Sequence, residues 1–158
     1  MKAMEKKRIL FVCTGNICRS PTAEGIAHHL AKVRGLADRF EFDSAGTHDY
    51  HVGEAPDRRA SAAAKRRGYD LSALRARQVS VADFQRFDLI LALDRGHLAW
   101  LAQRSPADAR ARLMLFLDLV PGHAGEDVPD PYYGGEAGFE HVLDLCEAAV
   151  EAVLVQPD

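Results

Sequence analysis

The sequence is poor in cysteine, has one tryptophan and lacks any long apolar run. Its three cysteines, Cys13, Cys18 and Cys146, are an odd number without the spacing of a secreted disulfide framework, which favours a reducing compartment and at least one free thiol. The apolar run at 113–120 contains an aspartate and is much shorter than the ~20 residues of a membrane span. The run at 9–12 is likewise too short for the apolar region of a signal peptide. We therefore expect a cytoplasmic protein without membrane contact.

An excess of charge of one sign is also absent, because 20 Lys and Arg residues stand against 23 Asp and Glu residues, for a formal net charge of -3. This balance disfavours a protein whose main ligand is nucleic acid. With 158 residues and 47% hydrophobic content, the chain can bury a core without disulfides or a structural metal. We expect one domain over residues 1–158, with an ordered core over 7–155, that acts as a monomer.

Apolar strand patterns alternate with helical patterns along the chain. Strands are expected at 8–12, 40–43, 87–93 and 112–117, and helices at 21–34, 56–67, 81–86, 95–104 and through the apolar stripe at 139–153. Pro21 is expected at the first helical position and Pro56 in a first turn. This alternation implies right-handed crossovers and predicts an α/β fold: a doubly wound, flavodoxin-like sheet of four parallel strands with helices on both faces. Such sheets bind ligands beyond the carboxyl ends of their strands.

A cluster of seven basic residues lies between the second and third expected strands, whereas no Lys or Arg follows Arg112. The seven residues are Arg58, Arg59, Lys65, Arg66, Arg67, Arg75 and Arg77. One interpretation of the cluster is a solvated helix face. The other is a basic rim that attracts anionic partners, such as acidic stretches of a substrate protein.

The loop after the first expected strand runs from Cys13 to Pro21 and reads Cys-Thr-Gly-Asn-Ile-Cys-Arg-Ser-Pro. Consecutive backbone N–H groups of such a loop point inward, and the dipole of the following helix adds partial positive charge, so the concavity suits a phosphate-like dianion. Arg19 can hold two oxygens of that anion in a bidentate fork. The donors that bind the anion also stabilise a thiolate at Cys13, which makes this residue a nucleophile.

This nine-residue loop closely resembles the active-site loop of low molecular weight protein tyrosine phosphatases. The resemblance continues through Asp-Ser-Ala-Gly-Thr at 43–47, His-Val-Gly at 51–53, Asp-x-Arg-Ala at 57–60, Leu-Asp-Arg at 93–95 and Asp-Pro-Tyr-Tyr at 130–133. These segments stand in family order and cover effectively the whole chain. The resemblance implies a bacterial-type phosphatase that needs no cofactor and no metal.

The resemblance assigns the chemistry to Cys13, Arg19 and Asp130. Cys13 would attack phosphorus to form a phosphocysteine, while Arg19 and the loop amides hold the phosphoryl oxygens. Asp130 would protonate the leaving phenolate and then activate water, a contribution of roughly 10²- to 10⁴-fold in rate. Without the cysteine loop, Asp130 would be interpreted as a turn residue before a proline.

The resemblance also implies roles for residues around the loop. Asn16 would support the strained loop through Ser44, and Ser20 would stabilise the thiolate. Asp94 is interpreted either as a supporting acidic residue or as a plain helix N-cap. Flat aromatic walls suit a phenyl ring, whereas phosphoserine would be too short to reach the cysteine. The residues expected to bind substrate are Thr14, Gly15, Asn16, Ile17, Cys18, Tyr50, Tyr132 and Tyr133.

The remaining cysteines and a histidine pair have separate interpretations. Cys18 matches a second loop cysteine of many relatives, whose proposed role is to trap oxidised Cys13 as a reversible disulfide. The alternative is a small residue that fills the loop. Cys146 lies on the apolar stripe of the last helix and is expected to be an inert core thiol. His48 and His51 have a His-x-x-His spacing, but without further nearby ligands no metal site is expected.

Particular residues distinguish a tyrosine phosphatase from other proteins with a similar loop. An arginine phosphatase of the same fold would carry threonine in place of Ile17 and phenylalanine in place of Tyr132, so both residues favour phosphotyrosine. An arsenate reductase would need resolving cysteines between Cys18 and Cys146, where the sequence has none. A different class is a catalytically silent module that binds phosphotyrosine without turnover. The expected partners are phosphotyrosine-containing proteins, with a bacterial tyrosine kinase as one candidate, and inorganic phosphate is the expected product.

Overall fold

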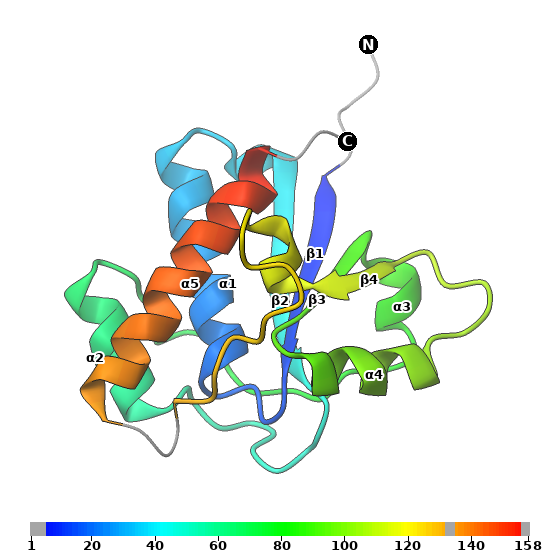
Figure 1. The fold of residues 1–158 in the computed structure, drawn as a ribbon, viewed down its shortest axis with the longest axis horizontal. Coiled ribbons are helices and arrows are strands. Elements are labelled where there is room, and N and C mark those ends of the chain that lie inside the picture. The colour runs from blue at the N-terminus through cyan, green and yellow to red at the C-terminus, as the bar shows by residue number, and fades with distance from the viewer. Residues whose placement is uncertain (1–5, 132–134, 156–158) are drawn as a thin grey trace.

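The computed structural model describes residues 6–131 and 135–155, and within them a parallel four-stranded sheet forms the centre of the fold (Figure 1). Its strands are β1 (Lys7–Cys13), β2 (Phe40–Gly46), β3 (Leu89–Ala92) and β4 (Arg112–Leu115). The strands lie in the order β2-β1-β3-β4, and every neighbouring pair is parallel. The predicted α/β fold is therefore confirmed, and β1 lies in the interior of the sheet.

Helices cover both faces of this sheet (Figure 1). They are α1 (Arg19–Val33), α2 (Arg58–Arg66), α3 (Asp83–Arg86), α4 (Arg95–Arg104) and α5 (Glu136–Val155), together with the 3-10 turns η1 (Ala37–Arg39) and η2 (Phe116–Leu119). Side chains of β1 alternate between the two faces, because successive residues of a strand point to opposite sides. Phe11 packs with α1, α2 and α5, whereas Leu10 and Val12 pack with α3 and α4. All three are fully buried, which stabilises the fold by about 1.5–3 kcal/mol per side chain.

Helices α1 and α2 begin at residues that differ from those predicted from Pro21 and Pro56. α1 starts at Arg19, so Pro21 is its third residue rather than its first. Proline is tolerated there because the first N–H groups of a helix have no acceptor within the helix. α2 starts at Arg58, and Pro56 precedes its N-cap. The side chain of Asp57 sets this start, since it accepts hydrogen bonds from the backbone N–H groups of the second and third residues of α2.

The strands also differ in length from the prediction. β2 runs to Gly46, beyond residue 43, because Ser44 and Ala45 pair with Phe11 and Val12 of β1 despite their turn-like composition. The predicted strand at 112–117 ends at residue 115, where the chain turns into η2. β3 is shorter than predicted, and α3 covers residues 83–86 of the predicted 81–86. α4 has the predicted bounds.

Gly46 places the end of β2 against the loop that follows β1. A side-chain Cβ at this position would lie 2.6 Å from the carbonyl oxygen of Thr14 and 3.1 Å from that of His48. Both contacts are with backbone, which cannot move aside without distorting the loop. The glycine therefore allows the two chain segments to approach closely at the carboxyl edge of the sheet.

The last helix confirms the predicted apolar stripe. The stripe residues, all buried, are Phe139, Val142, Leu143, Cys146, Ala149, Val150 and Val153. Burial raises the pKa of the Cys146 thiol above its usual value, and this is consistent with an inert core thiol. Across residues 6–131 and 135–155, no helix is both long and apolar enough to span a membrane.

The basic cluster is divided by the fold. Arg67 binds α5, where its guanidinium lies 3.1 Å from Glu140, 2.9 Å from Asp144 and 2.7 Å from Glu147. Arg77 forms ion pairs with Asp43 and Asp83. Arg58, Arg59 and Arg66 instead remain exposed on α2.

Candidate active site

The loop from residue 13 to residue 19, the 13–19 loop, connects β1 to α1 at the carboxyl edge of the sheet. It turns through Asn16, the one non-glycine residue with positive φ (58°) among the described residues. Asparagine adopts this left-handed conformation more readily than most residues do. Arg19 is the first residue of α1, so the loop ends at the N-terminus of a 15-residue helix, where backbone N–H groups and the helix dipole favour an anion.

Cys13 is the last residue of β1, and its side chain is buried at the bottom of the loop. Its Sγ lies 2.9 Å from Oγ of Ser20. The oxygen of Ser20 accepts a hydrogen bond from Nδ2 of Asn16 at 2.8 Å, which leaves the hydroxyl proton of Ser20 to point at the sulfur. A donor in this position stabilises a thiolate. The structure thus brings the Ser20 hydroxyl into contact with Cys13.

Asn16 is the centre of a buried hydrogen-bond network that fixes the loop. Its Nδ2 also donates to Oγ of Ser44 at 2.9 Å, and its Oδ1 accepts from the backbone N–H of Arg77 at 3.0 Å. Ser44 in turn donates to Oε1 of Glu24 at 2.7 Å. The side chain of Asn16 is directed into this network and does not line the cavity onto which the loop opens. It therefore supports the loop from behind, and the contact with Ser44 is the predicted one.

Glu24 is a member of this network that the sequence analysis missed. Glu24 is only 6% exposed, and its second carboxylate oxygen, Oε2, lies 3.0 Å from Nε2 of His28. The signal in the sequence was a lone carboxylate between Ala23 and Gly25 on the buried part of a helix. Burying a carboxylate is costly unless it is hydrogen-bonded, so its presence there indicates a polar partner.

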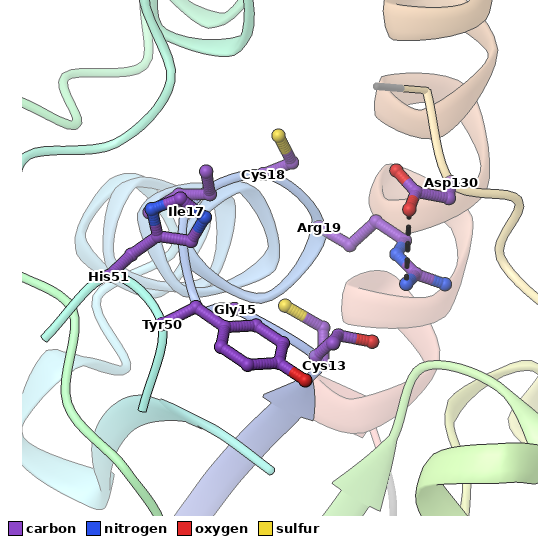
Figure 2. A pocket seen from close by; sticks show the side chains of 9 residues that line it. Cys13, Gly15, Ile17, Cys18, Arg19, Tyr50, His51 and Asp130 are labelled. Carbon is purple, nitrogen blue, oxygen red and sulfur yellow. Dashed lines mark ion pairs between the residues drawn. The ribbon is translucent and has the colours of Figure 1, made fainter. Parts of the chain in front are cut away.

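Arg19 is 5% exposed and is anchored from two sides. Its Nη1 donates to Oδ2 of Asp94 at 2.8 Å and to the carbonyl oxygen of Val128 at 3.0 Å. These two bonds fix the plane of the guanidinium. Its other terminal nitrogen, Nη2, lies 3.8 Å from Oδ2 of Asp130 (Figure 2). Asp130 is much more exposed than Arg19, with 46% of its side chain accessible.

Asp94 makes the contacts that both interpretations require. Its Oδ1 accepts a hydrogen bond from the backbone N–H of His97 at 2.8 Å, so it caps α4. Its Oδ2 holds Arg19 at the same time. One carboxylate therefore connects the start of α4 to the guanidinium of the site.

His97 is a second residue that the sequence analysis missed. Its Nε2 lies 2.7 Å from Oγ1 of Thr14, and its ring is buried. Burial lowers the pKa of His97 to about 4, despite the opposing effect of Asp94. The imidazole is therefore neutral at physiological pH. Its Nδ1 lies 3.1 Å from Oδ1 of Asp94 and, within the described part of the chain, makes no hydrogen bond.

The loop opens onto a cavity of about 290 Å³ (Figure 2). Its lining residues are Cys13, Thr14, Gly15, Ile17, Cys18, Arg19, Tyr50, His51 and Asp130. His51 was not predicted in this role. Tyr132 and Tyr133, which were predicted to form a wall, lie outside the described residues. Of the predicted aromatic walls, Tyr50 lines the cavity.

The rim of the cavity is built by the chain after β2. The ring of Tyr50 stacks on His48 with 5.0 Å between ring centroids, and 67% of Tyr50 is exposed. A Cβ on Gly15 would lie 2.9 Å from Cδ2 of His51, so glycine allows the loop to approach this imidazole. Nδ1 of His51 lies 3.0 Å from Oε2 of Glu54. Among the residues that the structure describes, no three His, Cys, Asp or Glu side chains form a group that could hold a metal ion.

Cys18 lines the same cavity but has a different chemical environment from the hydroxyl-bonded Cys13. Burial, and after it the negative charge of Asp57, raises the pKa of the Cys18 thiol to about 12. Cys18 is therefore a protonated thiol at neutral pH and a weak nucleophile on its own.

Three groups converge on a cavity large enough for a phosphate ester: a thiol with a hydroxyl donor, an anchored guanidinium and a carboxyl group. Cysteine-dependent phosphatases have this arrangement. Within that class, a family model described as "Low molecular weight phosphotyrosine protein phosphatase" matches residues 8–156. The chain belongs to this family.

Relatives of known name and structure agree with this membership. A low molecular weight protein-tyrosine-phosphatase of Streptomyces coelicolor is 45% identical over 150 residues, which cover 93% of this chain and 91% of the relative. The crystal structure of a protein tyrosine phosphatase from Entamoeba histolytica superimposes with a TM-score of 0.90 at 38% identity, covering 95% of this chain and 96% of that one. A Drosophila arginine phosphatase superimposes with a TM-score of 0.88 at 31% identity, covering 95% and 99%. The fold is thus shared by phosphatases of two substrate classes.

Proposed function

We propose that this protein is a protein-tyrosine phosphatase in which Cys13 is the nucleophile, Arg19 holds the phosphoryl group and Asp130 is the general acid and base. The observation that carries the proposal is the convergence of these three side chains on one cavity. The substrates are phosphotyrosine-containing proteins, as the names of the relatives suggest.

In the first step, the thiolate of Cys13 attacks phosphorus and the bond between phosphorus and the phenolic oxygen breaks. Asp130 donates its proton to the leaving oxygen, so tyrosine departs neutral and a phosphocysteine remains. Arg19 and the N–H groups of the 13–19 loop bind the equatorial oxygens, where negative charge is concentrated in the transition state. Ser20 stabilises the thiolate before the attack.

In the second step, the carboxylate of Asp130 takes a proton from water, which attacks phosphorus. The bond between sulfur and phosphorus breaks, inorganic phosphate leaves, and the thiolate of Cys13 is restored. Arg19 is suited to both steps because Asp94 and Val128 hold it in one orientation. A preorganised donor needs little rearrangement as charge develops.

The cavity walls favour an aromatic phosphate ester. Ile17 presents an apolar surface, while Tyr50 and His51 provide flat rings at the rim. An arginine phosphatase of the same fold would replace the isoleucine by threonine, so Ile17 favours phosphotyrosine over phosphoarginine. We also propose that the protein acts as a cytoplasmic monomer on proteins phosphorylated by a bacterial tyrosine kinase, without binding nucleic acid or membranes.

Cys18 is proposed to protect the nucleophile. When hydrogen peroxide oxidises Cys13 to a sulfenic acid, the thiol of Cys18 would condense with it, forming a disulfide and releasing water. A dithiol reductant would then restore both thiols. Cys18→Ala should lose activity irreversibly under peroxide that wild type survives after reduction, and equal recovery of both proteins would contradict this role.

The test of the proposed activity is phosphate release from a phosphotyrosine peptide and from phosphoarginine under reducing conditions. Wild type should hydrolyse the peptide preferentially, and Cys13→Ser should not turn over either substrate. Cys146→Ala removes a core cysteine as a matched control and should retain turnover. Faster release from phosphoarginine would keep the mechanism and reverse the substrate assignment. Binding without turnover in wild type would indicate a silent phosphotyrosine-binding module instead.

A further inference from the structure

A second cavity, which we name the α2–α5 groove, lies beside the active site and has a volume of about 300 Å³. Its α2 wall carries Arg58, Arg59 and Arg66, and its other wall is formed by Gly135, Glu136 and Phe139 at the start of α5. α2 and this end of α5 lie side by side in Figure 1. The groove thus combines three cationic side chains with one aromatic ring.

Two arginines of the groove, Arg58 and Arg66, are weakly neutralised compared with Arg67 and Arg77 of the same basic cluster. Arg58 has no ion-pair partner among the described residues, and it is exposed. Arg66 is paired with Glu140 only at 3.5 Å, with 54% of its side chain accessible. The guanidinium of Arg59 lies 5.0 Å from the centroid of the Phe139 ring, and its Nε lies 3.5 Å from Oδ1 of Asp57. The residues that line the groove include three arginines and one carboxylate, Glu136, so the lining itself carries more positive than negative charge on a protein whose formal net charge is -3.

Both walls of the groove are connected to the catalytic cavity. On the α2 side, the backbone N–H of Asp57 donates to the carbonyl oxygen of Ile17 at 2.8 Å, and Ile17 lines the catalytic cavity. On the α5 side, Pro131, the residue after Asp130, lies against Gly138 in the first turn of the helix. A peptide whose phosphotyrosine fills the catalytic cavity would therefore have neighbouring residues within reach of the groove.

We propose that the α2–α5 groove binds acidic side chains that flank the phosphotyrosine of a protein substrate, an inference that rests on the proposed function. Carboxylates complement the arginines, while the aliphatic part of Glu packs along the apolar stems of the arginine side chains. Exposed ion pairs each contribute little, so the groove increases the preference for acidic substrates by a modest factor rather than deciding whether they bind. Because these charges are exposed, salt weakens the preference.

The experiment compares kcat/KM for a neutral phosphotyrosine peptide and for peptides with Glu at one to four residues on either side. A small aryl phosphate, which cannot reach the groove, reports on the catalytic site alone. The variant is Arg58→Gln/Arg66→Gln. The matched control is Arg39→Gln/Arg112→Gln, which removes two exposed arginines at the opposite edge of the sheet, where β2 and β4 begin.

In wild type, at least one acidic peptide should exceed the neutral peptide by about 3- to 10-fold at low ionic strength, the size expected for a few exposed ion pairs. That ratio should fall towards one in Arg58→Gln/Arg66→Gln and persist in the control variant, with aryl phosphate hydrolysis unchanged in both. Arg58→Glu/Arg66→Glu should reverse the preference towards peptides that carry Lys.

Three results would overturn the inference. They are equal kcat/KM for all peptides in wild type, an equal loss of preference in both glutamine variants, and competition by a short RNA as effective as that by the acidic peptide. Absence of aryl phosphate and neutral peptide hydrolysis would instead remove the proposed function. Even then, affinities of acidic and neutral phosphopeptides for Cys13→Ser protein test the groove separately, since equal affinities would exclude it.

Discussion

The buried imidazole of His97 makes the stability of this protein depend on pH in a calculable way. The pKa of His97 lies at about 4 in the folded protein and at 6.5 in an unfolded chain. Between these values the unfolded state binds a proton that the folded state excludes, so stability is greatest above pH 6.5 and falls as the pH decreases towards 4. Each pKa unit corresponds to about 1.4 kcal/mol, and the full loss is therefore about 3 kcal/mol.

The groups that face His97 act in both directions. Asp94, Asp127 and Asp130 favour its protonation, whereas burial and the charge of Arg19 oppose it, and burial has the largest effect. A protonated ring would place a cation beside Arg19, although its Nδ1 faces Oδ1 of Asp94 at 3.1 Å. The neutral ring holds the Thr14 hydroxyl through Nε2 at 2.7 Å.

The perturbation is His97→Gln, which keeps an amide N–H that can reach Thr14 and removes the titration. Urea unfolding, followed by the fluorescence of the single tryptophan, Trp100 on α4, gives the free energy of unfolding at each pH. Between pH 7 and 4.5, wild type should lose on the order of 2 kcal/mol more than the variant does. His141→Gln, at an exposed site on α5, should run parallel to wild type.

Parallel pH profiles for wild type and His97→Gln would refute the reasoning, because they would mean that burial does not hold the folded-state pKa low. If the free energy of unfolding of the wild type rose as the pH decreased, the pH dependence would have the opposite sign to the one expected. Carboxylates elsewhere also titrate in this range, but they are common to the two proteins and cancel in the difference.

Further predictions concern the 13–19 loop. Gly46→Ala should push a methyl group against the carbonyl oxygen of Thr14 and cost about 1–3 kcal/mol, visible as a lower Tm together with weaker phosphate binding; an unchanged Tm would contradict the close approach. Asn16→Ala should lower the free energy of unfolding by about 1–3 kcal/mol because it leaves buried partners without hydrogen bonds. Asn16→Gly should lower it equally if the side-chain hydrogen bonds matter more than the left-handed backbone. Arg19→Lys retains the charge but loses the fork, so kcat/KM should fall by about 10²- to 10³-fold, whereas a loss below tenfold would show that charge alone suffices.

The sequence predicted the elements of this fold better than their boundaries. The alternation of apolar and helical patterns located all four strands of the sheet, since each strand contains a short apolar or alternating run in the sequence. Boundaries depended on tertiary contacts that a local pattern does not contain. Ser44 and Ala45 have turn-like composition, yet they extend β2 because β1 supplies a pairing edge.

In the site, the sequence pattern indicated the residues of the loop but not the distant residues that contact them. Cys13, Arg19 and Ser20 lie in one continuous motif, so their proximity follows from the loop itself. Glu24 and His97 were missed because their partners are far away in the sequence, at Ser44 for Glu24 and at Thr14 for His97. A pattern of residue types shows that a polar group is present on a helix, whereas its partner is defined only when the elements pack.

The separation of the site along the chain has a consequence for synthesis. A ribosome completes β1, the 13–19 loop and α1 early, but Asp94, Asp130 and the helix α5 that packs with α1 emerge much later. An unfinished chain therefore carries a reactive thiol beside an arginine whose anchoring carboxylate has not yet been made. It can neither orient that arginine nor protonate a leaving group, so the nascent polypeptide remains unable to remove phosphate until Asp94 and Asp130 have emerged and reached the loop.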